Sequence, residues 1–290
     1  VNPFALREGS KRPIVQDGDG RLVAVIGAGP AGMEAAVTLK QRGFDVVVFD
    51  KRDEIGGNLH VAKKPPFKGK FEWAIDYYKS MAKKLNITMK LGKEVTAQEV
   101  LALKPHSILV ATGSNVISIP LEGLDQVQTV QAHDVLANDM QFANKKVVVI
   151  GGGITGLETA LYINRQGTNQ VSVVDMLPEW PVDMLDMRYQ NEALLEVRHC
   201  NDQGVALFYN NKVVKFADGK LFIESTKDGE VKELPADVIV LSVGVKPNDA
   251  LWQELLASGH PSVWKAGDAI ATGKINKAVL HGSKFGYSLN

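Results

Sequence analysis

VAVIGAGPAG, residues 23–32, is one of two stretches that decide the fold of this chain, and VVVIGGGITG, residues 147–156, is the other. In each stretch an apolar run leads into the spacing G-x-G-x-x-G and then into a segment with helical character. An acidic residue follows about 20 positions later, at the end of a second apolar run: Asp50 in the first case and Asp175 in the second. Strand, glycine turn, helix, strand and acid together are typical of a βαβ unit that binds a dinucleotide. Two such units predict two bound dinucleotides, an arrangement that lets a hydride pass between them.

The composition of the 290 residues is that of an ordinary globular protein, with 45% hydrophobic and 23% charged residues. Basic and acidic residues balance at 33 each, so no positive excess favours nucleic acid or an anionic membrane as partner. We find no apolar run of spanning length and no signal-peptide pattern, and we therefore expect a cytoplasmic location. The single cysteine, Cys200, excludes a disulfide, a Cys-based zinc site and a redox cysteine pair within this chain.

The order of these patterns predicts an α/β protein with two Rossmann-like domains, the second inserted into the first. We expect residues 1–115 and the return segment 246–290 to form one domain, and residues 116–245 the other. Residues 51–66 are expected to form a loop. Turn signals within residues 205–234 predict an antiparallel meander.

The glycines of the first fingerprint have separate expected roles. Gly27 permits the tight turn, Gly29 lets a pyrophosphate approach the backbone, and Gly32 allows the helix to pack closely on the strand. Asp50 is expected to accept hydrogen bonds from a ribose. A glycine turn in an unrelated α/β fold is the alternative.

Two carboxylates of the second unit suggest how a nicotinamide dinucleotide is recognised. Glu158 is either a solvated helix residue or a partner for the nicotinamide carboxamide. Asp175 favours a free ribose 2′-hydroxyl over a 2′-phosphate. Residues 176–180 offer no Lys or Arg for a phosphate, so NADH is expected and NADPH is disfavoured.

Four further glycine turns carry a weaker signal, because each can be a plain turn. They lie at residues 56–58, 111–113, 242–244 and 267–268. The second and third follow apolar strands at corresponding places in the two units, which favours a role at the ligand.

Taken together, these motifs resemble the two-dinucleotide flavoproteins of the glutathione-reductase-like type. The resemblance places FAD on the first unit and the nicotinamide cofactor on the second. The implied FAD residues are Gly27, Gly29, Pro30, Ala31, Gly32, Asp50, Lys51, Gly57, Asn58, Val95, Ala111, Thr112, Gly113, Gly267 and Asp268. The implied NAD residues are Gly151, Gly153, Ile154, Thr155, Gly156, Glu158, Asp175 and Gly244. Asn58-Leu59-His60 stands where one branch has its redox cysteine pair, so that branch is excluded.

A closer resemblance is to the C-terminal half of the 2,4-dienoyl-CoA reductase and 2-enoate reductase flavoenzymes. It rests on residues 56–68, read as GGNLxxAxxPPxK, and on the opening Val1-Asn2-Pro3. It implies a preceding FMN barrel and a [4Fe–4S] segment, so the chain is expected to be part of a larger enzyme. Asp50 and Asn58 depart from the Glu and Gln that relatives often carry.

The resulting hypothesis is an NADH oxidoreductase module that passes a hydride to FAD and electrons onward, in a complete enzyme to iron–sulfur and FMN centres for enoate or dienoyl-CoA reduction. No catalytic side-chain set is expected, because the cofactors perform the hydride transfer. Two alternatives stay open: an electron-input subunit like the glutamate synthase small subunit, and a non-catalytic, redox-sensing dinucleotide module.

Overall fold

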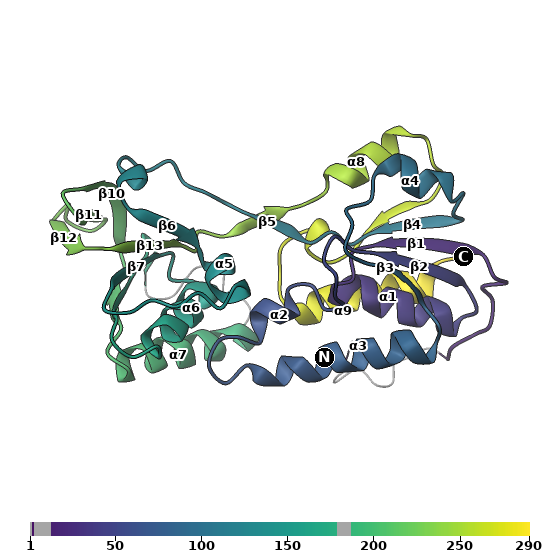
Figure 1. Cartoon of the computed structure of the whole chain (residues 1–290), viewed down its shortest axis with the longest axis horizontal. Helices are drawn as coiled ribbons and strands as arrows, with labels where there is room; N and C mark the ends of the chain where they lie inside the picture. The colour runs from purple at the N-terminus through teal and green to yellow at the C-terminus, as the bar shows by residue number, and fades with distance from the viewer. Residues whose placement is uncertain (1, 3–12, 179–186) are drawn as a thin grey trace. The chain divides into compact units, whose positions relative to one another are not determined.

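The computed structural model describes residues 2, 13–178 and 187–290, and these form two compact units (Figure 1). Unit 1 contains the described residues up to 63 together with 70–115 and 245–290. Unit 2 contains residues 64–69 and the described residues of 116–244. The return of the chain to unit 1 after Gly244 makes unit 2 an insertion, and each unit has its own parallel sheet.

The sheet of unit 1 has five parallel strands in the order β15-β4-β1-β2-β3. Their bounds are β1 Leu22–Ile26, β2 Asp45–Phe49, β3 Thr88–Lys90, β4 Ser107–Val110 and β15 Val263–Lys265. Val23 and Val25 lie in one hydrophobic cluster, and Ala24 and Ile26 lie in the cluster on the opposite face. Both faces of the sheet are therefore buried, which explains why β1 reads as an unbroken apolar run.

Six α-helices belong to the described part of unit 1. They are α1 Pro30–Gln41, α2 Leu59–Ala62, α3 Glu72–Lys84, α4 Ala97–Ala102, α8 Ala250–Ala257 and α9 Ile275–Ser288. Helix α9 packs against α1 so closely that a Cβ on Gly282 would lie 2.1 Å from the carbonyl oxygen of Ala31. The buried Arg42 guanidinium reinforces this packing, because it donates to the backbone oxygens of Gly286 at 2.7 Å and Leu289 at 2.8 Å.

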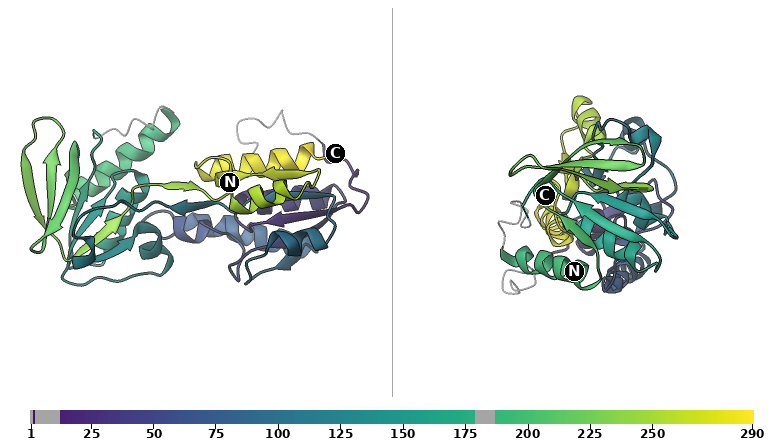
Figure 2. Two further views of the ribbon diagram at one scale, coloured as in Figure 1. Left: turned by 90° about the horizontal axis from the view of Figure 1, so that it is seen from above. Right: turned by 90° about the vertical axis from the view of Figure 1, so that its left-hand side faces the viewer.

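Unit 2 repeats the design with a parallel sheet in the order β6-β13-β7-β8-β9. The strands are β6 Gln128–Gln131, β7 Lys146–Ile150, β8 Gln170–Val174, β9 Ala206–Phe208 and β13 Val238–Leu241, and the α-helices are α5 Ala132–Ala137, α6 Ile154–Asn164 and α7 Met187–Asp202. A separate antiparallel sheet, green in Figure 2, contains β10 Asn211–Ala217, β11 Lys220–Ser225 and β12 Val231–Pro235. Two further short strands, β5 Ser114–Val116 and β14 Val245–Pro247, pair with each other where the chain leaves and re-enters unit 1.

The structure confirms the α/β class and corrects three local predictions. Strand β9 was expected in the meander but pairs in parallel with β8, so only β10–β12 are antiparallel. The expected loop 51–66 contains the short helix α2. Residues 64–69 were expected in the first domain but pack with unit 2. None of the helices in the described ranges is both long and apolar enough to cross a membrane.

Candidate functional site

The first fingerprint forms a loop that only glycine can complete. Gly27 has φ +112°, and a Cβ there would lie 2.2 Å from the carbonyl oxygen of Ala111. A Cβ on Gly32 would lie 1.9 Å from the carbonyl oxygen of Gly27. Gly29 differs: it caps the N-terminus of α1, and the nearest neighbour of a Cβ there would be the Cα of Gly57 at 4.0 Å. A side chain at the first or third glycine of the loop would therefore clash with the backbone, whereas the second glycine, Gly29, has free space beside it.

Asp50 braces this loop from the end of β2. Its Oδ2 accepts a hydrogen bond from the Ala28 backbone N–H at 2.6 Å, and its Oδ1 accepts one from the Arg52 N–H at 2.8 Å. The carboxylate therefore already has a structural role in the loop. Contact with a ribose stays a prediction for this residue.

Several predicted residues from distant parts of the chain meet at the same end of unit 1. Gly57, with φ +53°, lies against Gly29, and a Cβ on Gly267 would lie 3.0 Å from Ala31 Cβ. Asp268 accepts hydrogen bonds from the Gly273 N–H at 3.1 Å and the Ser114 hydroxyl at 3.3 Å. Burial raises the pKa of the Asp268 carboxyl.

The remaining predicted residues of unit 1 have more ordinary surroundings. The Thr112 hydroxyl donates to the Asn248 carbonyl at 2.5 Å, and Gly113 has φ +75°. Val95 is buried in the hydrophobic cluster that covers one face of the sheet. Lys51 and Asn58 are exposed, and Asn58 accepts a hydrogen bond from the Arg52 guanidinium at 3.2 Å.

The second fingerprint has the same close approaches and the same aspartate hydrogen bond as the first loop. A Cβ on Gly151 would lie 2.3 Å from the Ser242 carbonyl oxygen, and a Cβ on Gly156 would lie 1.9 Å from the Gly151 carbonyl oxygen. Asp175 Oδ2 accepts from the Gly152 N–H at 2.6 Å. A Cβ placed on Gly153 would meet no described atom within 4 Å other than those of its own chain neighbours. The second loop is thus packed and open at the same glycines as the first.

The other predicted residues of unit 2 lie on or near α6. Ile154 begins the helix, and the Thr155 carbonyl accepts from the Thr159 hydroxyl at 2.7 Å. Gly244, with φ +103°, accepts from the Ile117 N–H at 3.0 Å through its carbonyl. These bonds fix the backbone around the loop and leave the open position at Gly153 unobstructed.

Glu158 is mostly buried, with 13% of its side chain exposed, and its Oε1 lies 2.9 Å from the Lys68 ammonium. Burial raises the pKa of Glu158 more than Lys68 lowers it. Sequence reasoning gave Lys68 no function, although this residue ends the motif at 56–68. A lysine 90 positions away carries no local signal of this pairing.

Both loops fit the phosphate groups of a dinucleotide. Each places an open glycine at the N-terminus of a helix of more than ten residues, where unpaired N–H groups and the helix dipole favour an anion. In each, a carboxylate from the next strand holds the loop in shape. The chain therefore carries two similar cradles, one in each unit.

Comparison with known proteins identifies the family. Residues 21–280 match the model described as pyridine nucleotide-disulphide oxidoreductase. The chain belongs to this family. It is an oxidoreductase whose family uses FAD together with a nicotinamide dinucleotide, which is the pair of cofactors that the two cradles fit.

Three of the similar proteins are more than twice as long as this chain. An NADH oxidase of Thermoanaerobacter brockii is 32% identical over 100% of this chain and 44% of its own length. A bilirubin reductase of Mediterraneibacter gnavus is 34% identical over 82% of this chain and 36% of its own length. The solved structure of a 2-naphthoyl-CoA reductase complex superposes with a TM-score of 0.89 and 29% identity, over 100% of this chain and 43% of that one. The chain thus spans less than half of each of these proteins.

The cysteine of this chain is not part of a redox pair. Cys200 is fully buried in α7, and burial raises the pKa of its thiol to about 12. Its Sγ lies 3.8 Å from the Leu157 carbonyl oxygen. The family name refers to disulphide chemistry, but this chain has a single cysteine and cannot form a disulfide within itself.

Proposed function

We propose that this chain is an NADH-oxidising flavoprotein module, with FAD on unit 1 and NADH on unit 2. The observation that carries the proposal is the repeated loop geometry, in which an Asp carboxylate and two tightly packed glycines frame one open glycine. When bound, FAD accepts a hydride from the nicotinamide ring and can release electrons one at a time. The chain's own residues bind and orient the two dinucleotides.

In unit 1, we assign the pyrophosphate to the N-terminus of α1 beside Gly29. Gly57 and Gly267 permit close approach of the chain there, because neither carries a side chain and both have positive φ. Asp268, held by Gly273 and Ser114, is available to a ribityl hydroxyl, and Asp50 to the ribose.

In unit 2, we assign the NADH pyrophosphate to the N-terminus of α6 beside Gly153, and the carboxamide to Glu158. Asp175 supports the preference for NADH, since its carboxylate repels a 2′-phosphate. Met176 and Leu177, the next two residues, are apolar and exposed and provide no positive charge.

The onward acceptor belongs to this proposal as well. The three similar proteins described above are more than twice as long as this chain, and two of them carry the names of reductases. We propose that electrons leave FAD for iron–sulfur and FMN centres in a further portion of a larger enzyme, which reduces an enoate or a related unsaturated compound. The cytoplasm, with its supply of NADH, is the proposed location.

An anaerobic rapid-mixing experiment tests the proposal. The chain purified with FAD should lose the visible absorbance of oxidised flavin within seconds of mixing with NADH. The same chain should turn over with ferricyanide and NADH but should not reduce 2-enoates or dienoyl-CoA esters. NADH binding without loss of the flavin band would instead support a redox-sensing module, and sustained enoate reduction would place the substrate on this chain.

A further inference from the structure

A six-residue segment, Lys64–Gly69, leaves unit 1 after α2 and packs on unit 2. Lys64 forms an ion pair with Asp139, and the Phe67 ring lies between two partners of unit 2. These partners are the His199 ring, with a centroid distance of 5.1 Å, and the Arg165 guanidinium, 4.6 Å from the ring centroid. The segment is therefore fixed by three separate contacts to α7 and to the loops that follow α5 and α6.

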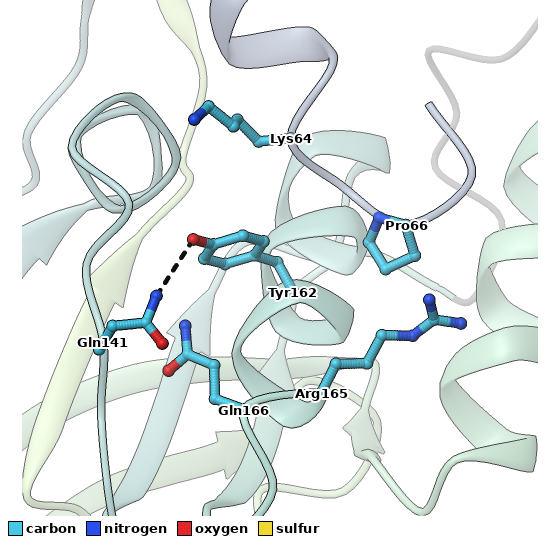
Figure 3. Close-up of a pocket in the computed structure, with 6 residues that line it drawn as sticks. All are labelled: Lys64, Pro66, Gln141, Tyr162, Arg165 and Gln166. Carbon is cyan, nitrogen blue, oxygen red and sulfur yellow. Dashed lines mark hydrogen bonds between the residues drawn. The ribbon is translucent and has the colours of Figure 1, made fainter. Parts of the chain in front are cut away.

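Figure 3 shows part of this attachment, with Lys64 and Pro66 above Tyr162 and Arg165. These residues line an open cavity of about 320 Å³. The Lys64 ammonium is already paired and the Gln141 amide already donates to the Tyr162 hydroxyl, so the cavity itself does not indicate a ligand. The informative residue of the segment is the next lysine.

The Lys68 ammonium enters a group of carboxylates that α6 and α7 contribute together. It lies 2.9 Å from Glu158 Oε1, 2.7 Å from Glu192 Oε1 and 3.9 Å from Glu196 Oε1. Glu196 is also 3.7 Å from His199 Nδ1. Burial lowers the pKa of Lys68, but its bonds to Glu192 and Glu158 more than offset this effect, so the pKa is raised and the lysine is a permanent cation.

We propose that Lys68 is a positioning residue for nicotinamide recognition: by holding Oε1 of Glu158, it directs Oε2 to accept a hydrogen bond from the carboxamide NH2 of NADH. This inference rests on the proposed function, which assigns the carboxamide to Glu158. The geometry supports it in two ways. Lys68 is anchored independently by Glu192, and the segment makes further contacts through Lys64 and through Phe67, which remains 70% exposed.

The charge of Lys68 also helps Glu158 to accept a hydrogen bond from the carboxamide. A buried carboxyl group that is not paired takes up a proton, and a protonated Glu158 would present an O–H donor on one oxygen and only a neutral, weaker acceptor on the other. Lys68 opposes this protonation because it interacts with the ionised form. Without Lys68, three neighbouring carboxylates would face one another at the start of the nicotinamide site.

The test measures binding rather than turnover. Dissociation constants are determined by calorimetry for NAD⁺ and for its 3-acetylpyridine analogue, in which a methyl group replaces the amide NH2. A hydrogen bond to an ionised carboxylate is worth about ten-fold in affinity, so the unmodified protein should prefer NAD⁺ by about that factor. In Lys68→Met the preference should fall to within about two-fold, through loss of NAD⁺ affinity alone.

Three further variants make the result decisive. Lys68→Arg should retain the preference, and Glu192→Gln, which removes the second anchor of Lys68 without removing its charge, should lower it in part. Lys212→Met is the matched control, because Lys212 forms an ion pair of 2.9 Å with Glu224 in the β10–β11 hairpin of the same unit. Equal weakening of both dinucleotides in Lys68→Met would show a purely structural role and overturn the inference.

Glu158→Gln separates this inference from the proposed function. If Glu158→Gln abolishes the preference for NAD⁺ while Lys68→Met retains it, Glu158 recognises the carboxamide without the help of Lys68. Because Gln keeps one acceptor oxygen, the assignment of the carboxamide to Glu158 is wrong if Glu158→Leu, which removes both acceptors, also retains the preference. In both cases the assignment of FAD to unit 1 is tested separately, by the flavin content of Gly29→Val.

Discussion

The two fingerprint loops have nearly identical interiors and different surroundings. In each, the aspartate Oδ2 accepts from a loop N–H at 2.6 Å, and a Cβ on the third glycine would lie 1.9 Å from the carbonyl oxygen of the first. Around the first loop, however, three glycine positions from elsewhere in the chain close in on the start of α1: Gly57, Gly267 and Gly282. Around the second loop, the Tyr209 ring approaches Gly152, where a Cβ would lie 2.9 Å from it, but a Cβ on Gly153 would meet no described atom within 4 Å other than its chain neighbours.

This difference agrees with the proposal that the two loops hold their dinucleotides in different ways. A dinucleotide surrounded by distant segments of the fold can leave only when those segments separate, whereas one bound to an open loop can exchange. A resident FAD and an exchanging NADH need these two environments. The comparison therefore supports the assignment of cofactors to units independently of the similarity to other proteins.

The strongest test of the comparison is a matched pair of variants. Gly29→Val should give colourless protein, because the added side chain fills the space assigned to the FAD pyrophosphate. Gly153→Val should stay yellow but bind NADH at least about 100-fold more weakly, since a steric block at a phosphate site removes several charge-assisted bonds. Flavin content by absorbance and NADH affinity by calorimetry measure the two effects.

Gly259→Val serves as the control for this pair, because Gly259 lies in a turn after α8 with open space around it. Its φ of +78° makes the substitution strained, so it shows how far backbone strain alone affects either ligand. If Gly29→Val retains its full complement of FAD, the pyrophosphate does not bind beside Gly29.

The next expected effect concerns the choice between NADH and NADPH. Asp175→Asn removes the charge but keeps an acceptor for the Gly152 N–H, so the loop should persist. We expect a preference for NADH of at least about ten-fold in the unmodified protein and a smaller one in the variant, because repulsion of a 2′-phosphate costs on the order of 1–3 kcal/mol. Asp218→Asn, in the turn between β10 and β11, is the control. Equal kcat/KM values for both dinucleotides in the unmodified protein would contradict the role of Asp175.

The sequence predicted what depends on local backbone geometry. The turns at Gly27 and Gly151 follow from spacing within one βαβ unit, and the structure contains the expected strands, turns and helices. The hydrogen bonds by which Asp50 and Asp175 hold the loop backbone were not predicted from the sequence. Contact of the two loops with bound ribose or phosphate stays a prediction. The sequence could not predict contacts made between distant segments. Lys68 meets Glu158 and Glu192 only because residues 64–69 pack on unit 2, and no periodicity in the chain encodes that placement.

Strand β9 shows a second limit. Its three residues, Ala206–Phe208, are all apolar and directly precede the alternating stretch, so the sequence offers no signal that separates β9 from the meander. Tertiary structure decides the pairing, because α7 returns the chain beside β8 and gives a parallel pair. An edge strand of three residues is too short for its sequence pattern to predict whether it pairs in parallel or antiparallel.

A smaller effect is expected at Glu34, a buried carboxyl on α1 that accepts from the Tyr78 hydroxyl at 3.1 Å. Burial raises its pKa, so the folded state binds the proton more tightly than the unfolded state. The stability associated with this proton is fully present below the unfolded pKa and is lost as the pH rises through the raised folded pKa. Glu34→Gln should therefore have little effect on Tm at pH 4 and should raise Tm at pH 8, because the amide carries no charge that burial disfavours.

Glu99→Gln provides the opposite case. The Lys93 ammonium and the Thr96 backbone hold the pKa of Glu99 down to about 2, so its contribution is lost only as the pH falls towards that value. Between pH 5 and 8 the effect of Glu99→Gln on Tm should be constant. If the effect on Tm increased with pH in both variants, the pH dependence would come from a group other than Glu34.

The smallest effect on activity is expected at Cys200, which lies in the same helix as Glu192 and packs against α6 beneath the second loop. Its thiol is fully buried and its pKa is raised to about 12, so almost no thiolate exists at neutral pH to act as a nucleophile. Cys200→Ser keeps a similar volume but places a hydroxyl in a fully buried site, where an unpaired hydroxyl costs about 1–3 kcal/mol, so we expect a stability loss of about that size. NADH-dependent reduction of ferricyanide should change by less than about two-fold, because hydride transfer between the cofactors needs no thiol. A loss of about 100-fold with flavin content and circular dichroism intact would require a thiol step, and the division between a resident and an exchanging dinucleotide would then not account for the activity.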